Sequence, residues 1–86
     1  MSWEIQWTPK SSKFLKNLDT ESATRILNKI EFLKENPFRY VEQYEGEYHK
    51  LRIGDYRALI DIDFENKIII IQVLDKMSRI YKGFNL

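Results

Sequence analysis

Hydrophobic and polar residues alternate at the beginning of the chain. Trp3, Ile5 and Trp7 are separated by single polar residues, and a period of two is typical of a β-strand with one buried face. We therefore predict a strand over residues 3–8. Both tryptophans share a face with Ile5, which favours a role in the core over one as a base-stacking surface.

The pattern then changes to a helical period in two consecutive segments. In the first, Thr8 can act as the N-cap and Pro9 as the first helical residue. In the second, Asp19 or Thr20 can cap a helix that ends before Pro37. The apolar stripes of the two helices comprise Phe14, Leu15 and Leu18, and Ala23, Ile26, Leu27, Ile30 and Leu33. Together the segments predict an antiparallel helical hairpin that covers one side of a sheet.

The next stretch, residues 37–47, has no sustained period. It holds proline, glycine, three glutamates and three aromatic residues, and we predict a loop there. The pattern of the residues that follow predicts three strands, over residues 48–53, 56–64 and 68–74.

Short turns join these three strands into a meander. Gly54 at the first position of a two-residue loop suits a type II′ hairpin turn, and the apolar residues 68–74 fit a central strand covered on both faces. The sequence therefore predicts one α+β domain over residues 1–86. In it, an N-terminal strand and the meander form a mainly antiparallel four-stranded sheet, the helical hairpin packs on one face, and a short helix or tail ends the chain.

Composition narrows the class of protein. The 86 residues allow one compact domain, and the absence of cysteine excludes disulfides and thiolate metal sites. Fourteen Lys and Arg against thirteen Asp and Glu give a net charge of +1, so a nucleic-acid site would have to come from local clustering. No signal-like or membrane-spanning stretch is evident, and we expect a cytoplasmic protein with no membrane partner.

Such a cluster is predicted at the first hairpin of the meander. If Gly54 and Asp55 form the turn, Arg52 lies directly across from Arg57, and Lys50 projects to the same face because side chains alternate along a strand. Like charges facing each other destabilise a sheet. Either an anionic ligand balances them, or they are ordinary solvated side chains neutralised by nearby carboxylates. Asp61 and Asp63 are the candidates for such neutralisation.

Residues 48–57, Tyr-His-Lys-Leu-Arg-Ile-Gly-Asp-Tyr-Arg, resemble the signature of the RelE/ParE toxin superfamily, as does the later segment Arg-Ile-Tyr-Lys at residues 79–82. The predicted order of strand, helical hairpin and three-stranded meander is also similar to that family. The resemblance implies the toxin of a toxin–antitoxin pair. For the RelE branch it implies an endoribonuclease that cuts mRNA on the ribosome without a cofactor.

The resemblance also implies site residues. It assigns catalytic roles to Lys50, Arg52, Arg57 and Tyr81, with RNA contacts by the same three cations and by Lys76, Arg79 and Lys82. One departure is Met77, which stands where many relatives carry an arginine. Lys76 or Arg79 are the candidates to replace it.

Cleavage by the RNA's own 2′-hydroxyl needs a proton acceptor, in-line geometry and stabilisation of a developing phosphorane. Arg57, helped by Arg52, suits the last of these because a guanidinium stays charged and its planar donors match phosphate oxygens. Lys50 could accept a proton only if crowding and desolvation favoured its neutral form. Tyr81 could stack on a base or donate to a phosphate.

The remaining candidate ligands do not indicate a metal site. His49 is the only histidine, and the alternation of the strand directs it away from Lys50, toward the helix-covered face or its edge. The aspartates lack the spacing of a calcium loop. A zinc site is not indicated either, because there is no second histidine. We predict no metal.

The C-terminal segment carries the apolar residues Met77, Ile80 and Phe84. The resemblance implies that a RelB-like antitoxin wraps the toxin and covers both this surface and the basic cluster. Two other functions stay open: a ParE-like inhibitor of DNA gyrase, and a catalytically weak RNA-binding relative.

Overall fold

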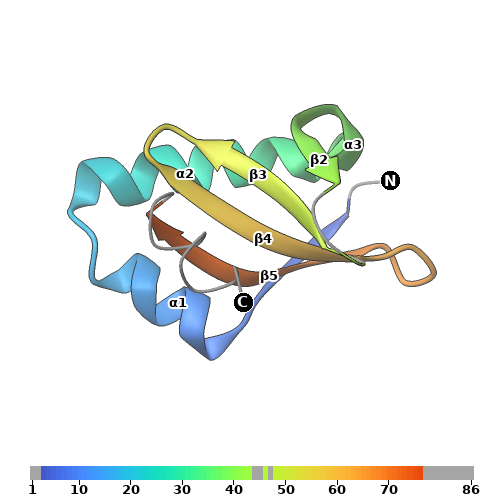
Figure 1. Cartoon of the computed structure of the whole chain (residues 1–86), viewed down its shortest axis with the longest axis horizontal. Helices are drawn as coiled ribbons and strands as arrows, with labels where there is room; N and C mark the ends of the chain where they lie inside the picture. The colour runs from blue at the N-terminus through green and yellow to red at the C-terminus, as the bar shows by residue number, and fades with distance from the viewer. Residues whose placement is uncertain (1–2, 44–45, 47, 77–86) are drawn as a thin grey trace.

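The chain folds as a helical hairpin packed on a five-stranded sheet (Figure 1). The computed structural model describes residues 3–43, 46 and 48–76. Its elements are β1 (Glu4–Trp7), α1 (Pro9–Lys16), α2 (Thr20–Leu33), α3 (Pro37–Tyr40), β2 (Val41–Gln43), β3 (His49–Ile53), β4 (Tyr56–Asp63) and β5 (Ile68–Lys76). The α+β prediction is confirmed, with the predicted order of strand, helical hairpin and meander.

The strands lie in the order β1-β5-β4-β3-β2. All neighbours are antiparallel except β1 and β5, which pair in parallel. In the view of Figure 1, α2 runs behind the sheet. The core lies between the sheet and the helices and consists of Ile26, Ile30, Leu33, Leu51, Ile53, Ala58, Ile60, Ile62, Ile69, Ile71 and Leu74. Trp3, Ile5 and Trp7 pack against this core as predicted.

The hydroxyl groups of Thr8 and Ser11 both donate to carbonyl oxygens of β5, and Thr8 also caps α1. The Thr8 side chain accepts a hydrogen bond from the Ser11 backbone N–H at 3.2 Å, as expected of an N-cap. The buried Ser11 hydroxyl donates to the carbonyl oxygen of Ile71 at 2.8 Å. These bonds satisfy polar groups that would otherwise be costly to bury, and they fix α1 against β5.

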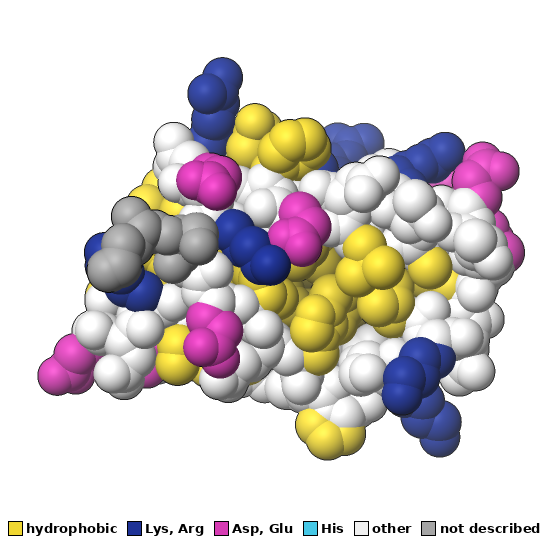
Figure 2. Space-filling view, turned by 180° about the vertical axis from the view of Figure 1, so that it is seen from behind, with side chains coloured by type: hydrophobic (Ala, Val, Ile, Leu, Met, Phe, Trp, Pro, Cys, Tyr) yellow, Lys and Arg dark blue, Asp and Glu magenta, His cyan; other side chains and the backbone are white. Residues whose placement is uncertain are grey.

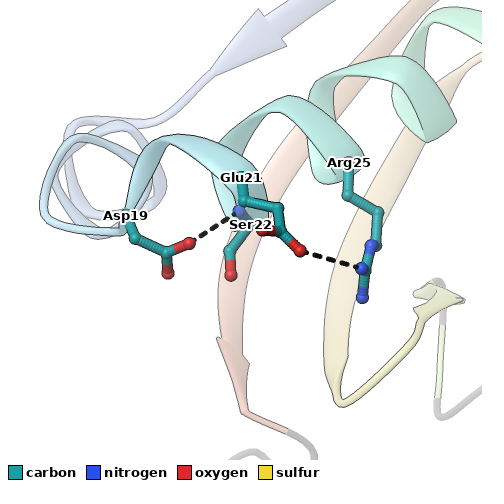
Figure 3. Close-up of polar contacts among 4 residues, drawn as sticks. All are labelled: Asp19, Glu21, Ser22 and Arg25. Carbon is teal, nitrogen blue, oxygen red and sulfur yellow. Dashed lines mark hydrogen bonds and ion pairs between the residues drawn. The ribbon is translucent and has the colours of Figure 1, made fainter.

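The second helix begins with an aspartate cap (Figure 3). Asp19 accepts a hydrogen bond from the Ser22 backbone N–H at 3.0 Å, which confirms Asp19 as the cap. This hydrogen bond stabilises the carboxylate and lowers the pKa of Asp19 below its ordinary value of 3.8. In the first turn, Glu21 forms an exposed ion pair at 3.7 Å with Arg25, which lies one turn further along α2.

The first turn of the meander has the predicted geometry. Gly54 has φ +57°, whereas Asp55 is not among the described residues with positive φ. A positive φ at the first position alone matches a type II′ turn. The turn fixes the pairing of β3 with β4, and this pairing positions the candidate site.

Residues 37–43 correct the sequence prediction. They form the one-turn helix α3 and the short strand β2 instead of a loop, and β2 makes the sheet five-stranded instead of four-stranded. A strand of 3 residues is too short to show a period of two. Strand limits elsewhere shift by one or two residues, and the predicted C-terminal helix or tail lies outside the described residues.

Candidate functional site

A basic pocket of about 290 Å³ lies at the β3 side of the sheet. Its lining comes from α2, from the end of α3 and from three strands: Lys29, Tyr40, Glu42, Lys50, Arg52 and Arg57. We call this hollow the basic pocket. Four of its six lining side chains are cationic and one is acidic, so it is suited to an anion.

The three cations predicted from the hairpin do lie together. Arg52 and Arg57 are direct partners in the register of β3 and β4, and Lys50 is two residues before Arg52. Leu51 and Ile53, which alternate with them, are buried in the core. The cations therefore occupy the sheet face opposite the core, and two guanidinium groups meet across neighbouring strands.

Carboxylates compensate part of this charge, but they are not the ones predicted. Glu42 lies 3.6 Å from the Lys50 ammonium, and Asp75 is the register partner of Arg57 on β5. Asp61 instead lines a separate hollow beside His49. Asp63 accepts hydrogen bonds from the side chain and backbone N–H of Asn66, which lower its pKa.

Two lining residues have no signal in the strand pattern. Tyr40 ends α3 and reaches the basic pocket at the point where the chain enters β2. The Lys29 ammonium lies 4.7 Å from the centre of the Tyr40 ring, a cation–π contact that orients both side chains. The sequence gives no sign of this contact, because Lys29 and Tyr40 are eleven positions apart and only the fold brings them together beside the hairpin.

Other predicted site residues are not joined to this cluster within the described part of the chain. Lys76 is the register partner of Tyr56, which packs against the core, so it belongs to the opposite face from Arg57. Its assignment to RNA binding stays a prediction. The predicted contacts of Tyr81, Arg79 and Lys82, and the antitoxin contacts of Met77, Ile80 and Phe84, fall on residues outside the described ranges.

His49 points away from the basic pocket. It pairs with Ile60 and shares a face with Leu51 and Ile53. Its Nδ1 atom is buried and lacks a hydrogen-bond partner among the described residues. Over those same residues, no group of three or more His, Asp or Glu side chains could hold a metal ion, and no helix is long and apolar enough to cross a membrane.

The sequence of the chain matches a protein-family model. Residues 5–81 match the family described as the ParE toxin of the type II toxin–antitoxin system parDE. The chain belongs to the RelE/ParE toxin superfamily. It is thus a toxin of a toxin–antitoxin system. No protein of curated function matches it in sequence.

Solved structures of RelE toxins share the fold. The RelBE2 complex of Mycobacterium tuberculosis matches with a TM-score of 0.79 and 21% identity, over 88% of this chain and 99% of that one. The RelE–RelB complex of Pyrococcus horikoshii gives 0.77 and 22%, over 92% and 99%. A mutant RelE from Escherichia coli gives 0.75 and 18%, over 95% and 93%. The family model names ParE and these structures name RelE, so the two branches must be separated by the chemistry of the site.

Proposed function

We propose that this toxin is a ribosome-dependent endoribonuclease that cuts mRNA in the cytoplasm and that a RelB-like antitoxin neutralises it. One observation carries the proposal: Arg52 and Arg57 face each other across two strands and line one pocket with Lys50. A fold gains no stability from two opposed arginines. A phosphate group between them turns this repulsion into two charge-assisted contacts.

The arginines supply electrostatic stabilisation. Attack by the 2′-hydroxyl on the adjacent phosphorus forms the new O–P bond as the bond to the 5′-oxygen breaks. The 2′-hydroxyl loses its proton, the leaving 5′-oxygen takes one from water, and negative charge builds on the phosphorane oxygens. Arg57 and Arg52 present planar N–H donors to these oxygens and keep their charge throughout. Fixed donors aimed at developing charge are among the largest contributions to catalysis.

Glu42 supplies the proton acceptor that the arginines cannot be. It is the acidic residue of the basic pocket, and its carboxylate lies 3.6 Å from the Lys50 ammonium. In this proposal Glu42 takes the 2′-hydroxyl proton while Lys50 holds a non-bridging phosphate oxygen. The side chain of Lys50 is only 24% exposed, against 74% for Glu42, so the carboxylate has room to turn toward a bound strand.

The main alternative is inhibition of DNA gyrase, which the ParE description of the family model favours. Gyrase inhibition does not require a proton acceptor and two phosphate-binding arginines in one pocket. Because Glu42, Arg52 and Arg57 line the same pocket, we prefer the nuclease. Met77, where many relatives have arginine, favours a second alternative, an RNA-binding protein of weak activity.

The RelB-like partner is proposed from the relatives. The Mycobacterium tuberculosis structure is described as a toxin–antitoxin complex, and the Pyrococcus horikoshii structure as a RelE–RelB complex. An acidic antitoxin segment over the basic pocket would exclude the RNA backbone by competing for the same cations.

One experiment separates the three functions. Purified toxin is added to a cell-free translation reaction and the ends of the transcript are mapped, with and without an inhibitor of initiation, while a parallel reaction measures supercoiling by DNA gyrase. Translation-dependent cleavage supports the proposal. Loss of supercoiling with an intact transcript would replace it by gyrase inhibition, and no effect in either reaction would leave the weak relative.

A further inference from the structure

A second hollow adjoins the basic pocket. It encloses about 320 Å³ between α2 and the β3–β4 turn. Its lining residues are Arg25, Asn28, Lys29, Phe32, Arg52, Ile53 and Gly54. Lys29 and Arg52 line both hollows, so the two are neighbours on either side of these cations. We call the second hollow the α2 pocket.

The edge of β3 is open between the two pockets. β2 pairs with β3 from His49 to Leu51, and Val41 is its first residue. Within the described residues, Arg52 and Ile53 thus have a strand partner on the β4 side alone. At this point the chain turns away into α3. A path therefore leads from the sheet face that carries Arg57, around the β3 edge, to α2.

Cations follow this path onto the helix. Arg25 and Lys29 are one turn apart on α2, and the Arg25 guanidinium reaches the hairpin turn, where a Cβ atom added to Gly54 would lie 3.7 Å from Nη1. Arg25 also pairs with Glu21, but at 3.7 Å and with side chains 65% and 84% exposed (Figure 3). Such surface pairs hold little free energy, so Arg25 can exchange this carboxylate for a phosphate.

Aromatic rings line the same path. Phe32 is 57% exposed in the α2 pocket, and Tyr40 is 36% exposed in the basic pocket. Their ring centres are 6.0 Å apart. Asn28 adds an amide that can donate to and accept from the edge of a base. Grooves that bind single-stranded nucleic acid combine these two elements, cations for the backbone and aromatic faces for the bases.

From this arrangement we propose that the α2 pocket is a second nucleotide subsite. A nucleotide next to the cleaved phosphodiester stacks its base on Phe32, and Arg25 and Lys29 hold its phosphate. The inference rests on the proposed nuclease function. It adds Phe32 as a residue that positions the RNA without touching the reacting atoms. Single-stranded RNA is favoured over an acidic peptide because it accounts for the exposed ring as well as for the cations.

Binding of a short single-stranded RNA tests the subsite. The probe carries 2′-O-methyl groups, which remove the nucleophile and keep the strand intact. At low ionic strength, Phe32→Leu should weaken binding about 5- to 150-fold, the range for loss of one stacked base, while Phe32→Trp should retain it. Phe64→Leu is the matched control, because Phe64 is 60% exposed in contact with Trp3 and Phe38, away from the pocket.

A set of probes that each lack one base identifies the stacked nucleotide. For the unaltered toxin, removal of the stacked base should weaken RNA binding. For Phe32→Leu, removal of the same base should have no further effect, because the ring and the base contribute to binding as a pair. The same variants are then compared by transcript cleavage in cell-free translation. If Phe32→Leu matches Phe64→Leu in both assays, the subsite is overturned and the nuclease proposal stands. It is equally overturned if Phe32→Leu weakens only antitoxin binding. If the unaltered toxin cuts no translated RNA, the nuclease proposal fails, and the subsite fails with it.

Discussion

Asp75 of β5 lies directly across from Arg57 of β4 in the register of the sheet. The central cation of the site therefore has a carboxylate on one flank and a second guanidinium, that of Arg52, on the other. The carboxylate moderates the repulsion between the arginines. The opposite flank is where a phosphate can be held by both guanidinium groups.

Removing Arg57 should abolish most of the cleavage. We expect Arg57→Ala to lower the rate of translation-dependent cleavage about 10²–10³-fold, by analogy with loss of one fixed donor to an oxyanion. Arg57→Lys should fall in between, because it keeps the charge and loses the planar donor pair. Lys10→Ala, an exposed cation on α1, is the control. Full activity of a folded Arg57→Ala, as judged by circular dichroism, would contradict the site assignment.

Glu42 should contribute to cleavage by accepting a proton. Glu42→Gln keeps the size of the side chain and removes the base, so we expect cleavage to fall about 10²–10⁴-fold, the usual contribution of general acid–base catalysis. RNA binding should stay equal or tighten, because a negative charge leaves the basic pocket. Glu65→Gln, in the exposed β4–β5 turn, is the matched control. Weakened binding with unchanged cleavage of bound RNA would assign Glu42 to structure instead.

The C-terminal departure from the family can be tested by two substitutions. If Arg79 replaces the missing basic group at Met77, Arg79→Ala should inactivate cleavage and Met77→Arg should be neutral. If the site works weakly without that group, Met77→Arg should raise the cleavage rate and Arg79→Ala should be silent. Should neither change alter the rate of transcript cleavage, the segment belongs to packing or antitoxin binding.

Antitoxin binding should protect the basic pocket. In hydrogen exchange of the toxin–antitoxin complex, we expect slower exchange at the edges of β2 and β3 and in the C-terminal segment. The competing surface is on the helical side. There Figure 2 shows a group of hydrophobic side chains in the middle of the face, with charged side chains beside it and toward the rim. Ile5, Trp7, Leu27 and Ile30 line a hollow together with Glu31 and Lys34. Protection confined to that hollow would exclude inhibition by occlusion.

Acid should remove the contribution of the Asp19 cap. The folded state lowers the pKa of Asp19, so its stabilisation is present above the ordinary value of 3.8 and is lost as the pH falls through the lower folded value. Asp19→Asn caps a helix nearly as well but does not titrate. In thermal melts, the two proteins should differ by a constant amount above about pH 5. Below that pH the wild type should lose stability faster, whereas parallel curves would rule out the cap as the cause.

The sequence predicts the parts of the site that depend on one short turn. Once Gly54 and Asp55 form a two-residue loop, the pairing of Arg52 with Arg57 follows without knowledge of the rest of the fold. Lys29, Tyr40 and Glu42 could not be predicted in the same way. They join the site through α3 and β2, which are too short to produce a periodic pattern.

The partner of Arg57 on β5 was unpredictable for another reason. The register of β4 and β5 shifts between Leu59 and Ile60. Ile60 pairs with Ile71 on one side of the shift. If this register continued along β4 without the bulge, Leu74 would lie across from Arg57. A bulge adds one residue to one strand and has no reliable sequence signature. Strand alternation alone places Asp61 and Asp63 on the face of Arg57, whereas the bulge brings Asp75 of β5 directly across from it.

The parallel pairing of β1 with β5 has a consequence for the order of folding. Glu4 pairs with Ile68 and Trp7 with Ile71, so the first strand has no partner until more than sixty residues have been synthesised after it. Contacts so distant in sequence close large loops and slow the rate of folding. On the ribosome that makes it, the chain thus has all the cations of the basic pocket before it has the strand that completes the sheet. A nascent toxin cannot assemble its core, and with it a rigid site, before β5 has emerged.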